Sequence, residues 1–484
     1  MTGQRSTGDT RGLALVAVMV VMGGALLVAT SLLFVLGAQV AGSSVAADRV
    51  QAQALARSGI MVVMARLNEQ RETILAGRTP ELDETYEIYE VGTRLGVVRL
   101  LPVGPGGALL VPEAGKRDLQ VTDAEMLAAT GLVDDLLAAR IVEYREQELR
   151  RPYQSVGELL GVTGMTVETL YGPIDQIGRA AAEGDRAQDG VRGLGDAITV
   201  YGFEPALQRN GRLRINLNVP WSDELGTRVA ERFGSASSDT LKRIMDGGTV
   251  FDTEAKIFGV LNFFQMEPSD WPEIIDTFTS EDGDLHYGRL DINTAPYEAL
   301  LTLPGFEPQQ AADVVRIRDD LSDEDRATVA WPAIHGIVEP QAYEQLGGLI
   351  TTRSWTYRFR LAAGEVDADA PRDGAMDRAI IYEVVLDLSS PRPRIAYLRE
   401  ITWLRTAALI AANVEIDTDT QPDPDINDPD LAAADPFSGD PAFGEQPGAA
   451  EFVPQDETGP DAPVQAGNEA ATPAGKRIGR WTAG

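Results

Sequence analysis

The segment from Leu13 to Val40 constrains this chain more than any other, because no charged residue occurs between Arg11 and Asp48. A helix needs roughly 20 apolar residues to cross a bilayer, and residues 13–40 are long enough. A short polar leader, residues 1–12, carries Arg5 and Arg11. Positively charged flanks stay in the cytoplasm, so we expect a single-pass membrane protein whose remaining chain lies on the other side.

Three interpretations of this apolar segment compete. A cleaved signal peptide has an apolar core of about 7–15 residues, which is shorter than this segment, although the small residues at Gly42–Ala47 resemble a cleavage site. A plain membrane anchor is the second interpretation. The third is a leader that is cut on the cytoplasmic side between Gly12 and Leu13, so that the apolar helix stays on the mature protein.

The apolar segment is followed by a helical pattern in a region, residues 41–116, that ends with short β-prone runs. Apolar residues recur there at helical spacing, namely Ala56, Ile60, Val63, Met64 and Leu67. We expect one helix from Leu13 to Leu75, about 90 Å long at 1.5 Å per residue. Two helices broken near Gly42 are the alternative. Residues 86–111 then predict two or three antiparallel strands.

Strand patterns return in residues 353–416. Trp355, Tyr357, Phe359 and Leu361 alternate with polar residues, as in a strand with one buried face. Two further runs, at Ile380–Leu388 and Ile395–Leu404, complete this set. We expect these strands to pair with those of residues 86–111, which makes everything between them, residues 117–352, one large helical insertion in a small antiparallel sheet.

The insertion contains an internal repeat of residues 118–145 in residues 291–318. Each copy begins with an aspartate, an apolar residue and an amide side chain, continues through a glycine hairpin and ends with an arginine. The members are Asp118, Gln120, Gly131 and Arg145 in the first copy, and Asp291, Asn293, Gly305 and Arg318 in the second. This pattern predicts helix-hairpin-helix units of a SAM-like helical domain. Arg214–Val219 resembles the start of a third copy.

Helix-hairpin-helix units often bind nucleic acid, because hairpin backbone N–H groups approach a phosphate. Here acidic residues crowd the hairpins, namely Asp134, Asp135 and Glu307, and the net charge of the whole chain is -32. Phosphate binding needs clustered basic residues. We therefore expect these units to serve packing or protein contacts, and we keep a membrane-anchored DNA-binding protein as the alternative function.

Little in the sequence indicates a catalytic, cofactor or metal site. The chain has no cysteine and two histidines, which excludes disulfides and cysteine-rich zinc sites, and no catalytic motif marks an enzyme or a cofactor site. Acidic loops offer oxygen ligands for calcium, with Asp282, Asp284, Asp373 and Asp377 as the candidate residues. Residues 417–484 are rich in Asp, Pro, Ala and Gly and predict a disordered acidic tail.

Taken together, these parts resemble a known family. A short basic leader ending in Gly12, an apolar helix, an interrupted sheet and the motifs Glu113–Val121 and Gly288–Gly305 resemble the K-type minor pseudopilin of type II secretion systems (general secretion pathway protein K). The likeness covers about Arg11 to Arg405. It implies an α+β fold with a long N-terminal transmembrane helix, a pilin-like antiparallel sheet, a large helical insertion and an extra C-terminal tail.

The resemblance also implies a function. Prepilin peptidase would cut after Gly12 and methylate the amine of Leu13. The fifth mature residue is Ala17, whereas most pseudopilins have glutamate there and K-type members usually lack it. These members lie at the pseudopilus tip and initiate or cap the filament that drives protein export. The implied partners are the I- and J-type minor pseudopilins and the inner-membrane platform of a bacterial cell, with the C-terminal domain in the periplasm. Some members bind calcium.

Overall fold

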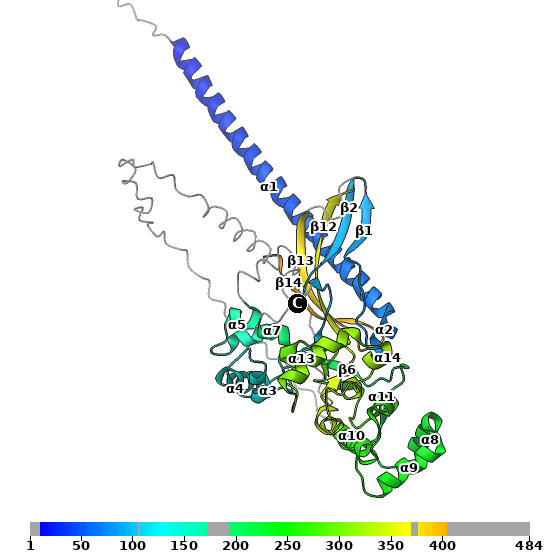
Figure 1. Cartoon of the computed structure of the whole chain (residues 1–484). Helices are drawn as coiled ribbons and strands as arrows, with labels where there is room; N and C mark the ends of the chain where they lie inside the picture. Colours follow the sequence, from blue (N-terminus) through cyan, green and yellow to red (C-terminus); the bar gives the residue numbers. More distant parts are fainter. Residues whose placement is uncertain (1–9, 105–106, 173–192, 369–375, 404–484) are drawn as a thin grey trace, which may run out of the picture. The chain divides into compact units, whose positions relative to one another are not determined.

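A computed structural model describes residues 10–104, 107–172, 193–368 and 376–403. Most of the leader, and the tail at residues 417–484, lie outside the described residues. The described chain is a mixture of helices and antiparallel sheet, with one long apolar helix at its N-terminus (Figure 1).

The long helix α1 runs without a break from Thr10 to Glu69. It passes through Gly42, so the alternative of two helices broken there is wrong. The prediction that one helix continues to Leu75 is also wrong, because α1 ends before Gln70 and a separate short helix, α2, spans Arg71–Leu75. The Gln70 amide donates to the Glu81 carbonyl at 2.7 Å and accepts the Glu81 N–H at 2.9 Å. These bonds tie the end of α1 to the chain that returns toward the sheet.

The main sheet has the strand order β1-β2-β12-β13-β14, and all four neighbouring pairs are antiparallel. The short strand β3 also pairs with β12. The bounds are Thr85–Val91 for β1, Arg94–Leu101 for β2, Val111–Pro112 for β3, Thr356–Asp367 for β12, Asp377–Asp387 for β13 and Arg394–Glu400 for β14. Because β2 pairs with β12, the residues between them lie between two neighbouring strands of this sheet.

The second half of α1 packs against one face of the sheet (Figure 1). The helix contributes four fully buried residues of the face that its periodicity predicts, namely Ala56, Ile60, Val63 and Leu67. They join a core that includes Val98 of β2, Phe359 of β12 and Val384 of β13. The apolar stripe therefore positions α1 on the sheet, because burial of its side chains is the main favourable term in packing a helix on a sheet.

The other face of the sheet is covered, whereas the alternation at Trp355–Leu361 predicted a strand with only one buried face. Thr356 on this face is 0% exposed. Arg358 and Arg360, which also alternate with the buried aromatic residues, are largely buried and form ion pairs with Glu383 of β13. A second apolar cluster with Val97 of β2 lies further along the sheet. Strand β12 is thus covered on both faces, and its charged residues are paired rather than solvated.

Gly59 sets the closest approach of α1 to the sheet. A Cβ atom at this position would lie 2.6 Å from Cγ2 of Val98, which is too close without a shift of the helix. Alanine normally stabilises a helix relative to glycine by up to about 1 kcal/mol. We expect Gly59→Ala to reverse this sign and to lower the free energy of unfolding by about 1–3 kcal/mol through overpacking. Chemical denaturation measures the change. Gly37→Ala is the control, because no atom lies within 4 Å of its added Cβ, and an equal effect of both variants would contradict this explanation.

The described part of the insertion contains three units. An apolar core lies in each, and the core of the third unit also includes Phe258, Leu261 and Trp271 of the second. The first contains β4 (Arg117–Asp118), α3 (Ala124–Ala129), α4 (Asp135–Glu143), α5 (Val167–Tyr171), α7 (Leu194–Ala197) and β5 (Ile198–Thr199). The second contains β7 (Ile215–Asn216), α8 (Asp223–Phe233), α9 (Ser235–Asp246), α10 (Glu254–Phe263), α11 (Pro272–Thr277) and β8 (Phe278–Thr279). The third contains β10 (Leu290–Asp291), α12 (Tyr297–Leu300), α13 (Pro308–Ile317), α14 (Asp323–Arg326), α15 (Trp331–Ile334), α16 (Tyr343–Leu346) and β11 (Ile350–Thr351). The antiparallel pair β6 (Phe203–Pro205) and β9 (Leu285–Tyr287) flanks the second unit in the sequence.

Candidate functional site

The first functional feature is the apolar part of α1. Among the described residues, one helical segment, Val18–Gly37, is long and apolar enough to cross a membrane, and 0% of it is buried by the rest of the protein. Gly12 and Leu13 lie in the first turn of α1. A cut between them would leave the rest of the helix whole. By length and composition, the segment is compatible with a membrane anchor or a signal sequence.

The second feature is the set of three repeated units. In each of them the same backbone contacts join the first strand of the unit to its last strand. Each unit starts and ends in a strand of a short parallel pair, β4 with β5, β7 with β8 and β10 with β11. In each unit the residue after the first strand donates its N–H to a threonine carbonyl of the last strand. The pairs are Leu119 to Thr199 at 2.9 Å, Leu217 to Thr279 at 2.8 Å and Ile292 to Thr351 at 3.0 Å. The second of these units begins in the segment Arg214–Val219, which the sequence indicated as the start of a third copy.

The aspartates that begin the predicted repeats fold the backbone at the start of each unit. A side-chain oxygen accepts the N–H of the residue two positions later, which is an Asx turn. The bonds are Asp118 with Gln120 at 2.8 Å, Asn216 with Asn218 at 2.7 Å and Asp291 with Asn293 at 3.0 Å. Burial raises the pKa of both Asp118 and Asp291 to about 6. These residues therefore have a structural role that does not require a negative charge, since Asn216 performs it in the second unit.

The amide residues of the pattern connect each unit to other parts of the chain. Asn293 donates from Nδ2 to the carbonyl of Gly77, just after α2, at 3.2 Å and to the carbonyl of Arg326 at 2.7 Å. It thereby links the third unit to the end of the N-terminal helices. Gln120 in the first unit makes two hydrogen bonds with the backbone of Tyr153. The same chemistry, an amide that satisfies backbone groups, thus explains why both copies carry an amide there.

The hairpin glycines take the conformation that a tight helix-to-helix turn requires. Gly131 and Gly305 both have φ near +71°, a left-handed conformation that glycine adopts without steric cost. The helices that follow, α4 and α13, have acidic N-caps. Asp134 accepts a backbone N–H of α4, and Glu307 forms a reciprocal capping box with Gln310 on α13. In these two units the carboxylates occupy the N–H groups that would otherwise face a phosphate.

The second unit contains a hairpin glycine that sequence reasoning missed. Gly234 separates α8 from α9 with φ +85°, and no side chain caps α9. The motif Arg214–Val219 indicated the start of this unit. The hairpin itself was not recognised, because asparagine replaces the initial aspartate at position 216 and the helices share no motif with the other copies.

Of the four candidate calcium residues, Asp282, Asp284 and Asp377 lie among the described residues. There, no group of three or more His, Cys, Asp or Glu side chains is arranged to hold a metal ion. Asp282 accepts a hydrogen bond from Nδ2 of Asn216 at 2.6 Å. Asp284 follows two residues later in the same loop and accepts the Ala206 N–H with its backbone carbonyl. Asp377 begins β13, and Asp373 lies outside the described residues.

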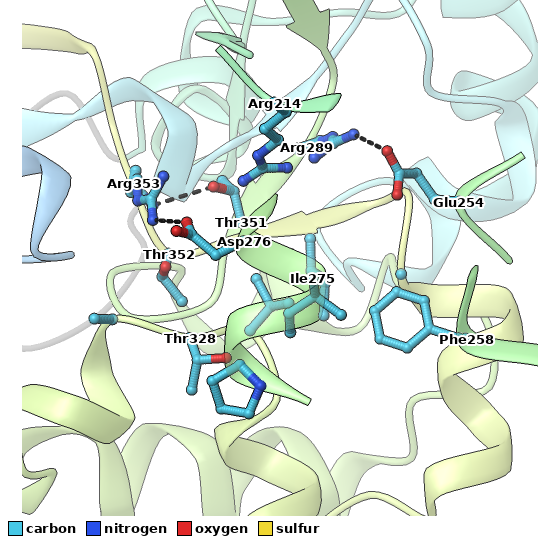
Figure 2. Close-up of a pocket in the computed structure, with 15 residues that line it drawn as sticks. Arg214, Glu254, Phe258, Ile275, Asp276, Arg289, Thr328, Thr351, Thr352 and Arg353 are labelled. Atoms are coloured by element: carbon cyan, nitrogen blue, oxygen red, sulfur yellow. Dashed lines mark hydrogen bonds and ion pairs between the residues drawn. The ribbon is translucent and has the colours of Figure 1, made fainter. Parts of the chain in front are cut away.

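A buried cluster of charged side chains lies between the second and third units, and sequence reasoning missed it. Arg289, just before β10, is 5% exposed and forms ion pairs with Glu204 at 3.2 Å, Glu254 at 3.2 Å and Glu281 at 2.6 Å (Figure 2 draws the pair with Glu254). His286 lies 3.8 Å from Glu204. Burial alone would lower the pKa of Arg289, but its carboxylate partners raise it above its usual value. No sequence spacing indicated this cluster, since its members come from separate elements.

A scan of protein-family models finds none that matches the chain, and a search of curated proteins also finds no match. The candidate site therefore rests on the chain's own geometry: an exposed apolar helix, a sheet that holds the end of that helix, and three packed units inserted in the sheet. The hairpins of two units direct carboxylates at their helix N-termini.

Proposed function

We propose that the chain is a minor pseudopilin of the K type, which initiates or caps the tip of a type II secretion pseudopilus. One observation carries the proposal. A single unbroken helix runs from a charge-free segment into the core of a small antiparallel sheet, and a large helical insertion lies between two paired strands of that sheet, β2 and β12. The apolar half of such a helix holds the subunit in the membrane before assembly, and its second half carries a pilin-like sheet.

The insertion and the start of the helix support a position at the filament tip. Three units rather than two enlarge the body that would clash with a subunit stacked above. The fifth residue after the proposed cleavage point is Ala17. A carboxylate buried there would need a positive partner, such as the N-terminal amine of a neighbouring subunit. A subunit without that carboxylate needs no such partner, which is what a terminal position requires.

The proposal describes an assembly protein that is not an enzyme and that needs no cofactor for catalysis. Its partners would be the I- and J-type minor pseudopilins, the inner-membrane secretion platform and, during maturation, prepilin peptidase. The anchor would lie in the inner membrane with the C-terminal domain in the periplasm. Calcium remains a proposed ligand of the subunit, and Asp282 and Asp284 share a loop in which oxygen ligands are available.

Processing at Gly12 tests the proposal. We expect intact mass and N-terminal sequencing of the chain from its own membranes to show a mature protein that starts at N-methylated Leu13. The variant Gly12→Leu should stay uncut and keep residues 1–12, because a bulky residue replaces the small one before the cleaved bond. Gly8→Leu, a matched change in the same leader, should be processed normally. A wild-type chain that starts at Met1 or near Ala46, or a Gly12→Leu variant of mature size, would refute the proposal.

The alternative, a membrane-anchored DNA-binding protein of a competence or type IV pilus system, has one favourable observation. Each of the three units has a hairpin glycine in the left-handed conformation, namely Gly131, Gly234 and Gly305, and the hairpin at Gly234 has no side-chain cap. If DNA is the ligand, the full chain in detergent should bind labelled duplex at low salt with an affinity that falls steeply as salt is added. Gly234→Asp should then weaken that binding. We expect no salt-sensitive binding from the K-type subunit.

A further inference from the structure

The second apolar cluster of the sheet lies on the face opposite α1, because its residues alternate along the strands with those that pack on α1. Strand pairing brings its members together, since Ala362 of β12 pairs with Ile381 of β13 and Val366 of β12 pairs with Leu95 of β2. Each buried member is at most 9% exposed. These members are Leu95, Val97, Ala362, Val366, Met376, Ile381 and Ile401. A continuous apolar patch on this face is therefore shielded from water.

The described residues of this cluster form a single layer. They belong to β2, β12 and β13 or directly flank β13 and β14, and the two partly buried residues that pack against them, Leu101 and Ala379, are also strand residues. In the described part of the chain, neither α1 nor the three inserted units contribute an apolar side chain to the cluster. Side chains on one face of a sheet stand side by side and project in the same direction, so they do not bury one another fully. A further segment or another molecule must cover them.

The sequence outside the described residues contains a stretch suited to this patch, Leu404–Val414. It reads LRTAALIAANV, with Arg405 as its one charged residue and with no glycine or proline. Alanine, leucine and arginine are strong helix formers, so the composition favours an apolar helix. The other stretches outside the described residues are less suited. Residues 369–375 read DAPRDGA, residues 173–192 carry charges throughout, and residues 417–484 are acidic and rich in proline.

The place where this stretch begins and its length both match the patch. It starts three residues after Ile401, a member of the cluster whose N–H donates to the Ile381 carbonyl at 2.8 Å. As a helix it would be about 16 Å long and about 10 Å wide. The patch extends about 13 Å along β12, from Ala362 to Val366, and about 10 Å across three strands. One helix of this length is therefore enough to cover it.

We propose that Leu404–Val414 packs as a helix on the second apolar cluster, so that the sheet lies between α1 on one face and this helix on the other. Burial of apolar side chains drives the contact. The stretch is tethered to the patch at Ile401, which gives it a high effective concentration there, whereas a second copy of the chain would have to bind from solution. Leu404–Val414 is then the last element of the sheet domain, and the acidic residues that follow it begin beyond that helix.

Disulfide scanning of the full chain in detergent micelles tests the proposal. The chain has no cysteine, so Ala362→Cys can be combined with a cysteine at each position from 404 to 414 in turn. A disulfide needs Cα atoms within about 7 Å. We expect disulfides within one chain at positions three or four residues apart, which lie on the same helix face. Ala363→Cys, the next residue on the α1 face, is the matched control and should form none. A disulfide between two chains would assign the patch to a second copy. That result, or no disulfide with Ala362→Cys at any position, would overturn the proposal.

The reactivity of the single Ala362→Cys thiol toward a maleimide gives a second test. Ala408→Pro breaks a helix at Leu404–Val414 whichever face it buries, and we expect it to speed this reaction about tenfold or more by opening the patch. It should leave the reaction of the Ala363→Cys thiol unchanged, and Ala433→Pro, the same change in the acidic residues, should affect neither thiol. If Ala362→Cys does not fold, Met376→Cys places a smaller side chain in the same cluster and replaces it in both tests. An unchanged rate in the Ala408→Pro variant would overturn the proposal.

Discussion

Replacing Arg358 with methionine should lower the free energy of unfolding by about 3–5 kcal/mol, which is the cost of breaking a buried ion pair on one side. Arg358 on β12 donates from Nε to Glu113 at 2.6 Å and from Nη1 to Glu383 at 2.6 Å. Glu113 is 0% exposed and also accepts the hydroxyl of Thr199 in the first unit. Methionine fills the space of the arginine stem but leaves both carboxylates without their main partner. Chemical denaturation at pH 7 measures the loss.

The double variant Arg358→Met, Glu113→Gln is the informative control. A neutral glutamine still accepts the Thr199 hydroxyl, and it removes the buried charge that the single variant leaves unpaired. We expect it to recover a substantial part of the lost stability. Hydrogen exchange should show that the single variant loses protection around Glu113 and Thr199 first, where the sheet meets the insertion. A single variant as stable as the wild type would mean that Lys116 and Arg360 suffice to hold the two carboxylates.

The same ion pairs determine how the stability of the folded protein changes with pH in the acid range. Burial alone would raise the pKa of Glu113 and Glu383, but Arg358, assisted by Lys116 or Arg360, holds both at about 2. A carboxyl whose folded pKa is depressed contributes stability above its unfolded pKa, near 4.5, and loses it as the pH falls toward 2. Acid should therefore weaken the junction of sheet and insertion below about pH 5.

The sequence predicted well the features that depend on local spacing and on backbone conformation. The stripe Ala56–Leu67 identified the helix face on the sheet, since burial selects apolar residues at helical spacing. Two of the three hairpin glycines, Gly131 and Gly305, were identified because a tight turn between helices requires a left-handed residue. The predicted Asp118 and Asp291 lie at equivalent places, but their role is to fold the backbone. The sequence showed the positions without showing the role.

Long-range pairing of charges was the part that could not be predicted. Alternation at Trp355–Leu361 indicates that one face of a strand is apolar, and it says nothing about whether the arginines opposite are solvated or paired with Glu383. The contacts of Arg289 join residues up to 85 positions apart. No local spacing encodes such contacts, because tertiary packing brings the partners together after the local structure is set. The prediction of a solvated strand face failed for this reason.

Changing Asp291 to asparagine should stabilise the protein at pH 8, by on the order of 3 kcal/mol at most. Burial raises the pKa of Asp291 to about 6 from a usual 3.8, and each pKa unit corresponds to about 1.4 kcal/mol. A carboxyl with a raised folded pKa binds its proton more tightly in the folded state, so stability falls as the pH rises from about 4 to about 7. Asparagine has no charge to bury, and Asn216 shows that its side chain makes the same Asx turn, at 2.7 Å.

The gain from Asp291→Asn must therefore depend on pH, with little or none at pH 4 and its full size at pH 8. Denaturant titrations at both pH values measure it. Asp118→Asn should behave in the same way, because burial also raises that pKa to about 6. Asp134→Asn is the matched control, since asparagine is as good an N-cap as aspartate and this residue is exposed. A loss of stability at pH 8, or a gain of equal size at both pH values, would show that the Asp291 carboxylate holds its unit together through its charge.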